Sequence, residues 1–69
     1  MSALGLALPD VLVTREGGIF LVQPVSRTAR EWVEENVYDP MYWGNAVVAE
    51  GRYVYELVDG MLDAGLVVR

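Results

Sequence analysis

Residues 11–24, with the sequence VLVTREGGIFLVQP, decide the fold because they predict a β-hairpin. Two short apolar runs, residues 11–14 and residues 19–23, flank two consecutive glycines that can take positive φ in a tight turn. Pro24 has no N–H to donate to a neighbouring strand, so we expect strand pairing to end there.

An amphipathic helix is predicted after this hairpin. Four apolar residues fall on one face at helical spacing, with the tryptophan expected in the core: Ala29, Trp32, Val33 and Val37. Ser26 is a candidate N-cap, and a capping box from Thr28 to Glu31 is a competing start. The helix should end at Asp39, because a residue before proline is pushed out of the helical region.

A second helix opens at Glu50 or Gly51. Its apolar stripe is wide and contains six residues: Tyr53, Val54, Leu57, Val58, Met61 and Leu62. Gly65 stands where a glycine commonly ends a helix, and Leu66 beyond it can contact Met61, as in a Schellman motif.

Short apolar strands are also predicted at residues 46–49 and 66–69, so the element order is β-β-α-β-α-β. We expect an α+β fold of two layers, with one small mixed sheet and both helices on one face of it. Residues 11–69 form this single α/β domain, and residues 1–10 form an apolar leader that is partly ordered. Residues 19–22, like the later apolar strand, are apolar on both sides of the pleat. The sheet face away from the helices therefore needs a cover, either the leader or another chain.

The residue types exclude most catalytic chemistry. The 69 residues include no cysteine, no histidine and no lysine, which removes thiolate metal sites and the commonest acid–base catalyst. Helix capping explains the hydroxyls of Ser26 and Thr28, and the glycine pair of the hairpin is too short to cradle a phosphate. Glu31 and Glu35 stand one turn apart, but a solvated acidic helix face explains them without a metal. We therefore expect no enzyme and no cofactor.

The net charge points to a class of partner. Ten carboxylates against five arginines give a net charge of −5, which disfavours direct binding to nucleic acid or to an anionic membrane. The apolar run of the leader ends at Pro9, has no basic segment before it and is too short to span a bilayer. The lack of cysteine suits a reducing compartment, so we expect a cytoplasmic protein. The surplus negative charge instead favours a basic protein partner.

Two groups of residues are candidates for contacting such a partner. Acidic residues at steps of three or four form a row along each helix: Glu31, Glu34, Glu35 and Asp39, and then Glu56, Asp59 and Asp63. Three aromatic residues are candidate anchors, because Tyr and Trp tend to dominate binding energy at interfaces: Tyr42, Trp43 and Tyr55. Alternatives stay open at this point. The acids could serve solubility alone, and Tyr42 and Trp43 could plug the end of the small core. One loop could also do both, with Trp43 inward and Tyr42 outward.

Residues 29–68 resemble a group of small bacterial proteins that are often found on phages and other mobile elements. The likeness lies in three motifs: A-R-E-W-x-E-E-N-V at residues 29–37, W-x-G-x-A-x-V-x-E at residues 43–50 with the tryptophan spacing shifted, and R-Y-V…L…G-M…G-L-x-V at residues 52–68. No catalytic or binding residue carries over from this group. In size and charge the chain is also similar to phage-encoded anti-CRISPR inhibitors of type I complexes. That likeness implies steric and electrostatic blocking of a DNA-binding surface on the effector complex.

The leading hypothesis is a non-enzymatic inhibitor that binds a basic nucleic-acid-binding protein, such as a CRISPR effector subunit, as a monomer or a homodimer. The alternative is a small homodimeric interaction protein with no inhibitory role. Its dimer would form through the second face of the sheet and would bury Phe20 or Leu21.

Overall fold

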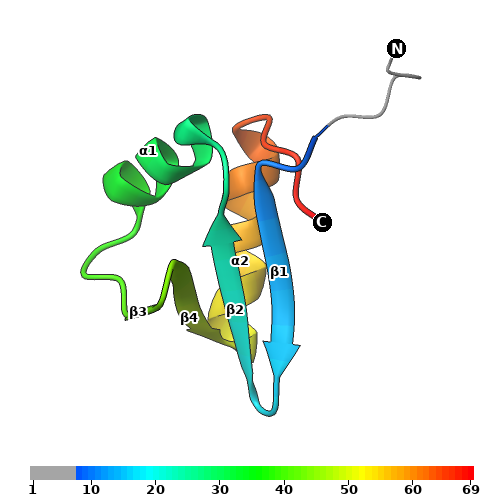
Figure 1. Cartoon of the computed structure of the whole chain (residues 1–69), viewed down its shortest axis with the longest axis vertical. Coiled ribbons are helices and arrows are strands. Elements are labelled where there is room, and N and C mark those ends of the chain that lie inside the picture. Colours follow the sequence, from blue (N-terminus) through cyan, green and yellow to red (C-terminus); the bar gives the residue numbers. More distant parts are fainter. Residues whose placement is uncertain (1–7) are drawn as a thin grey trace.

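The chain has the expected α+β architecture in a computed structural model that describes residues 8–69 (Figure 1). Its elements are β1 Val11–Glu16, β2 Ile19–Pro24, α1 Arg27–Asn36, β3 Tyr42–Trp43, β4 Ala46–Glu50 and α2 Gly51–Asp63. The four strands pair antiparallel in the order β1-β2-β4-β3. Of the expected leader, residues 1–7 lie outside the described residues.

The β1–β2 hairpin forms as predicted, with Gly17 and Gly18 as its two-residue turn. Gly17 has a φ of 62°, a conformation that residues with a Cβ disfavour. Pairing ends at Pro24, which lies opposite Val11. Because side chains alternate along a strand, the register of this hairpin fixes which residues face the helices.

The C-terminal residues extend the sheet beside β1, at the place of the strand predicted for residues 66–69. Val11 and Val68 form a parallel bridge. The N–H of Arg69 donates to the Val11 carbonyl at 2.9 Å, and the N–H of Val13 donates to the Arg69 carbonyl at 2.8 Å. The predicted strand is thus reduced to one isolated parallel bridge with flanking hydrogen bonds, and the sheet that we expected to be mixed is antiparallel in all four of its strands.

Helix α1 begins and ends through local contacts. A first-turn N–H donates to Oγ of Ser26 at 3.1 Å, so Ser26 is the N-cap and the competing start at Thr28 is wrong. The helix ends at Asn36, before the predicted end at Asp39. The reason is Val37, whose extended backbone turns its side chain into the core while its N–H still bonds to a carbonyl of the last turn.

Helix α2 ends in the predicted Schellman motif. Gly65 has a φ of 86°, and its N–H donates to the Leu62 carbonyl at 3.0 Å. The N–H of Leu66 donates to the Met61 carbonyl at 3.0 Å, and both side chains are buried. The buried face of α2 is narrower than the predicted stripe, because Tyr53 and Leu62 are exposed.

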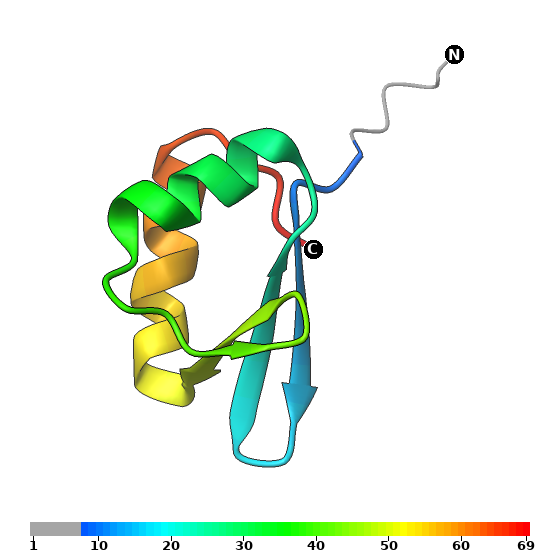
Figure 2. The same ribbon diagram turned by 60° about the vertical axis from the view of Figure 1, so that its left-hand side comes forward.

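Both helices cover the same face of the sheet, and the core lies between the two layers (Figure 2). Fully buried side chains from both layers meet there, among them Val22, Val47, Val33 and Met61. Trp32 packs on this core in part and lies against Gly60 of α2. A Cβ on Gly60 would lie 2.9 Å from the Trp32 ring, so the helices approach closely because residue 60 has no side chain.

The opposite side of the sheet is called the open face below. The strand registers place these sets of neighbouring residues on it: Glu16, Ile19 and Glu50; Thr14, Leu21 and Val48; Leu12 and Gln23; and Ala46 and Trp43. Neither α1 nor α2 covers this face (Figures 1 and 2). Phe20 packs against the core on the helix side, so a contact through the open face would bury Leu21 and not Phe20.

Candidate protein-binding surface

The loop between α1 and β3 is strained at one residue. Among residues 8–69, Asp39 is the one non-glycine residue with a positive φ, at 50°. Such a conformation costs about 1–3 kcal/mol and persists where the surrounding structure or a function requires it. Asp39 is exposed and Pro40 follows it directly, so the loop is held in an unusual shape at the surface.

Strand β3 is absent from the sequence prediction, which treats residues 38–45 as a connection. A strand of two residues is too short for the alternation of apolar and polar residues that identifies strands. The signal that could have found it is the turn, since Gly44 and Asn45 between two apolar pairs favour a two-residue hairpin. Gly44 indeed has a φ of 64°.

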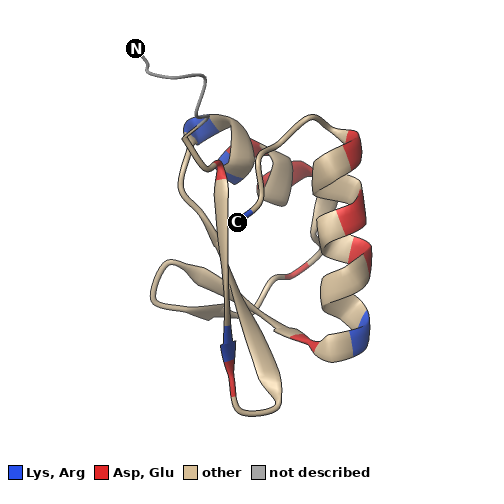
Figure 3. Cartoon of the chain, turned by 90° about the vertical axis from the view of Figure 1, so that its right-hand side faces the viewer, with Lys and Arg blue, Asp and Glu red and all other residues tan. Residues whose placement is uncertain are grey.

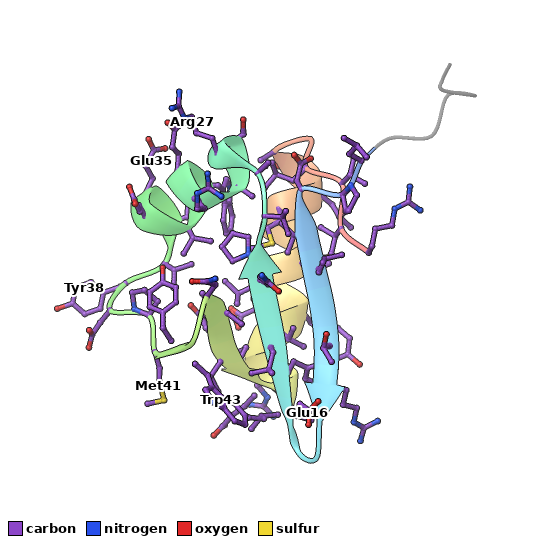
Figure 4. All side chains as sticks on the ribbon, in the orientation of Figure 1. Glu16, Arg27, Glu35, Tyr38, Met41 and Trp43 are labelled. Carbon is purple, nitrogen blue, oxygen red and sulfur yellow. The ribbon has the colours of Figure 1, made fainter. Side chains whose placement is uncertain are left out.

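The aromatic side chains of β3 are exposed and point to opposite faces. Trp43 is 61% exposed and lies opposite Ala46 on the open face, whereas Tyr42 is 50% exposed and lies on the helix side. The alternative in which these two residues plug the core is therefore wrong. Val37, which directly follows α1, is buried in the core instead. Tyr38 is also exposed and, like Met41, projects from this end of the molecule (Figure 4).

The acidic residues of α1 are exposed but stand among arginines. Glu31 follows Arg27 by four residues, and Glu34 follows Arg30 by four, which is the spacing at which helical side chains meet. Glu35 projects from the same outer side of the helix as Arg27 (Figure 4). The guanidinium of Arg30 donates to a backbone carbonyl just after β2 at 2.6 Å. Helix α1 therefore carries only one surplus negative charge.

The acidic residues of α2 form a more concentrated surface, which is called the acidic row below. Glu56, Asp59 and Asp63 are all exposed and follow one edge of the helix (Figure 3). Arg52 stands one turn before Glu56, but the last turn of α2 holds no basic residue. The partial negative charge at the end of a helix also opposes Asp63. The C-terminal half of α2 is thus acidic without local compensation.

The structure brings some candidate contact residues together and separates others. Tyr55 is 73% exposed on α2, next to the acidic row. Tyr42 lines a pocket of about 420 Å³ with Arg30 and Glu34 of α1. Trp43 lies on the open face, away from both. The candidates therefore form one surface on each helix and a separate tryptophan, not one continuous patch.

Residues 8–69 contain neither a cluster of metal-ligating side chains nor a membrane-spanning helix. Within residues 8–69, no group of three carboxylates is arranged so that it could hold a metal ion. Neither helix in that range has the length and hydropathy needed to cross a membrane.

Asp10 is a structural residue that the sequence does not single out. Its Oδ2 accepts from the Val67 N–H at 2.8 Å, and its backbone carbonyl accepts from the Val25 N–H at 2.7 Å. The bond from Val67 and a second one from the Ser26 hydroxyl hold the pKa of Asp10 below its ordinary value. Val67 is 57 positions away in the chain, so no local pattern could have predicted the contact.

Comparison with known proteins does not identify a function for the chain. No family model, no curated protein and no solved structure matches the chain. The resemblance to anti-CRISPR inhibitors therefore stays a hypothesis.

Proposed function

We propose that this protein is a non-enzymatic inhibitor that binds a basic, nucleic-acid-binding protein through the acidic row of α2. The observation that carries the proposal is the run of three exposed carboxylates along one edge of that helix (Figure 3). Tyr55 beside them supplies an exposed aromatic anchor of the kind that dominates interfaces. Such an inhibitor works in the cytoplasm of a bacterial host and needs no cofactor.

The spacing of the acidic row suits arginines that bind a phosphate backbone. From Glu56 to Asp63 the helix rises about 10 Å, at roughly 1.5 Å per residue. Phosphates of one DNA strand follow each other at about 3.4 Å along the helix axis, so the row spans about three phosphate steps. Three steps join four phosphates, so the three carboxylates carry somewhat less charge than such a piece of one strand and far less than a duplex. The protein would block a few DNA-binding arginines rather than imitate a whole DNA site.

The acids of α1 and its following loop make a weaker second contact in this proposal. Glu31 and Glu34 are each within a turn of an arginine, which offsets part of their charge. Glu35 and Asp39 lie nearer the exposed loop, where Tyr42 adds an aromatic contact. The contribution of this second contact to partner binding should therefore depend more on shape complementarity than on charge.

Type I CRISPR effector complexes are the first partners to test, because the chain resembles their inhibitors in size and charge. The protein and its variants are immobilised and exposed to a purified complex of this kind. Glu56→Lys combined with Asp59→Lys should abolish binding. The matched control, Glu16→Lys combined with Glu50→Lys, makes the same change of charge on the open face and should keep it. Circular dichroism of each variant shows whether the fold is intact.

A second pair of reversals separates the two helices. Glu34→Lys combined with Glu35→Lys should weaken binding less than the reversal on α2, since α1 carries less surplus charge. If the complex still binds this double variant and also binds Glu56→Lys combined with Asp59→Lys, the acidic-surface mechanism is rejected.

A further inference from the structure

We propose that the pocket between α1 and the β3–β4 hairpin binds a free α-amino acid with an apolar side chain, a function beyond the inhibition proposed above. The pocket has a volume of about 420 Å³, which lies within the range of about 300–1,000 Å³ that is usual for small-molecule sites. Three segments line it: the end of β2, helix α1, and β3 with the turn that follows it. The acidic row does not line it, so the two sites are separate.

Regular structure holds all three segments in place. Pairing between β2 and β4 stops at Val22, whereas pairing between β2 and β1 continues to Pro24. The turn between β3 and β4 lies beside this end of β2, below α1 in Figure 2. Gly44 in that turn has a φ of 64°, and Ser26 fixes the start of α1. The pocket is therefore built from strand ends and a helix rather than from a long loop, so it exists before a ligand binds.

Two opposite charges of α1 line the pocket without pairing to each other. Arg30 and Glu34 stand one turn apart, but no ion pair joins them. Nη1 of Arg30 instead donates to the Val25 carbonyl at 2.6 Å, which holds the guanidinium at the pocket. The remaining N–H groups of this guanidinium and the carboxylate of Glu34 have no hydrogen-bond partner within residues 8–69. A ligand can therefore bind both groups without breaking an existing ion pair.

The rest of the lining offers apolar surface and a neutral polar group. Pro24 and Val25 contribute apolar surface at the end of β2, and Tyr42 contributes a half-exposed ring on the helix side of the sheet. Asn45 lines the same pocket, and its side-chain amide has no hydrogen-bond partner in the described part of the chain. The pocket thus offers a place for an apolar side chain beside places for two charged groups.

These groups suit a zwitterion. In an α-amino acid a single carbon carries both the carboxylate and the ammonium group, so two long side chains one helical turn apart can reach them together. The forked guanidinium of Arg30 binds the carboxylate, and the carboxylate of Glu34 accepts from the ammonium group. A phosphate would bring surplus negative charge next to Glu34, in a chain whose net charge is already −5. An amino acid with an apolar side chain brings none.

Amide NMR shifts of the full chain test the pocket with two probes, L-leucine and L-phenylalanine. At least one of them, at millimolar concentration, should shift the amides of Arg30, Tyr42 and Asn45, while the amides of the acidic row should not move. N-acetyl-L-phenylalanine lacks the positive charge and L-phenylalaninamide lacks the negative one. The corresponding analogues of the probe that binds should therefore bind about tenfold more weakly or worse, because each leaves one charged group of the pocket unpaired.

This comparison of ligands uses only the wild-type chain, so it does not depend on whether a variant folds. Three results would overturn the proposal: no shifts with either probe, shifts confined to residues outside the pocket, or analogues that bind as tightly as the parent amino acid.

Variants with matched controls assign the binding to the two charged residues. Arg30→Gln and Glu34→Gln, each made alone, should weaken binding about tenfold or more, because each leaves one charge of the ligand without its partner. Arg27→Gln and Glu31→Gln make the same changes at the same spacing on α1 but outside the pocket, and should leave binding unchanged. Equal effects inside and outside the pocket would contradict the proposed contacts. Circular dichroism of each variant shows whether α1 is intact.

The amino-acid site and the inhibitory function can fail separately. Glu56→Lys combined with Asp59→Lys, which should abolish binding of the basic partner, should leave the affinity for the amino acid unchanged. Loss of amino-acid binding in this folded double variant would contradict the assignment to the pocket. A wild-type chain that binds the amino acid but no effector complex would reject the inhibitory function alone.

Discussion

At the start of β1, the carboxylate of Asp10 accepts from the Val67 N–H and the Ser26 hydroxyl, and so joins three distant segments around a thin core. Both hydrogen bonds favour the ionised carboxylate, so the pKa of Asp10 is lower in the folded chain than in the unfolded one. The resulting stabilisation is complete above the ordinary aspartate pKa of about 3.9. It is lost as the pH falls through the lowered folded value.

Replacing Asp10 should therefore change how stability depends on acid. Asp10→Asn should lower the melting temperature near neutral pH and flatten its fall between about pH 5 and pH 2, because asparagine has no proton to bind there. Asp10→Ala should lower the melting temperature further, since the Val67 N–H then loses its acceptor. Thermal melts by circular dichroism across this range measure both effects. Parallel acid profiles for wild type and Asp10→Asn would contradict the role of this carboxylate.

At the scale of the element, the contact between α1 and α2 depends on a missing side chain. Gly60→Ala gains about 1 kcal/mol in helix propensity, but its Cβ meets the Trp32 ring at 2.9 Å. Forcing extra volume into a packed site costs about 1–3 kcal/mol, so we expect a net loss of unfolding free energy together with altered Trp32 fluorescence. Gly51→Ala in the same helix meets its nearest atom, on Phe20, at 3.8 Å and should not destabilise the chain. Urea unfolding of the two variants checks this, and equal gains for both would contradict the close approach.

The C-terminal end of α2 carries an electrostatic conflict that a substitution can relieve. Asp63→Lys removes a negative charge and adds a positive one where the helix end is partially negative, so the free energy of unfolding should rise by about 0.3–1 kcal/mol. Glu56→Lys, two turns earlier and beside Arg52, should bring no such gain. Urea unfolding at low salt measures the difference. In the proposed function Asp63→Lys also weakens partner binding, so stability and binding should move in opposite directions.

An element can be predicted from the sequence when the interactions that form it lie between neighbouring residues. The hairpin, the Ser26 cap and the Schellman end of α2 depend on neighbouring residues, and all three were predicted. Strand β3 depends on pairing with β4, and the early end of α1 depends on Val37 entering the core, so neither is visible in local periodicity. The exposure of Tyr42 and Trp43 is of the same kind, because an aromatic residue suits a core and an interface equally well.

At the scale of the whole molecule, the two layers present different chemistry to solvent. The helical layer carries the acidic residues proposed to meet a basic partner, whereas the open face of the sheet layer has the apolar pair Leu21 and Val48 at its centre (Figures 1 and 3).

The most direct test of the central claim is the displacement of DNA from a basic partner. Fluorescence anisotropy follows a labelled target DNA on a purified type I effector complex as this protein is added. The wild-type chain and the Glu16→Lys, Glu50→Lys control should release the DNA, whereas Glu56→Lys combined with Asp59→Lys should leave it bound. DNA that stays bound at saturating wild-type protein, or that both double variants displace equally, would contradict the account.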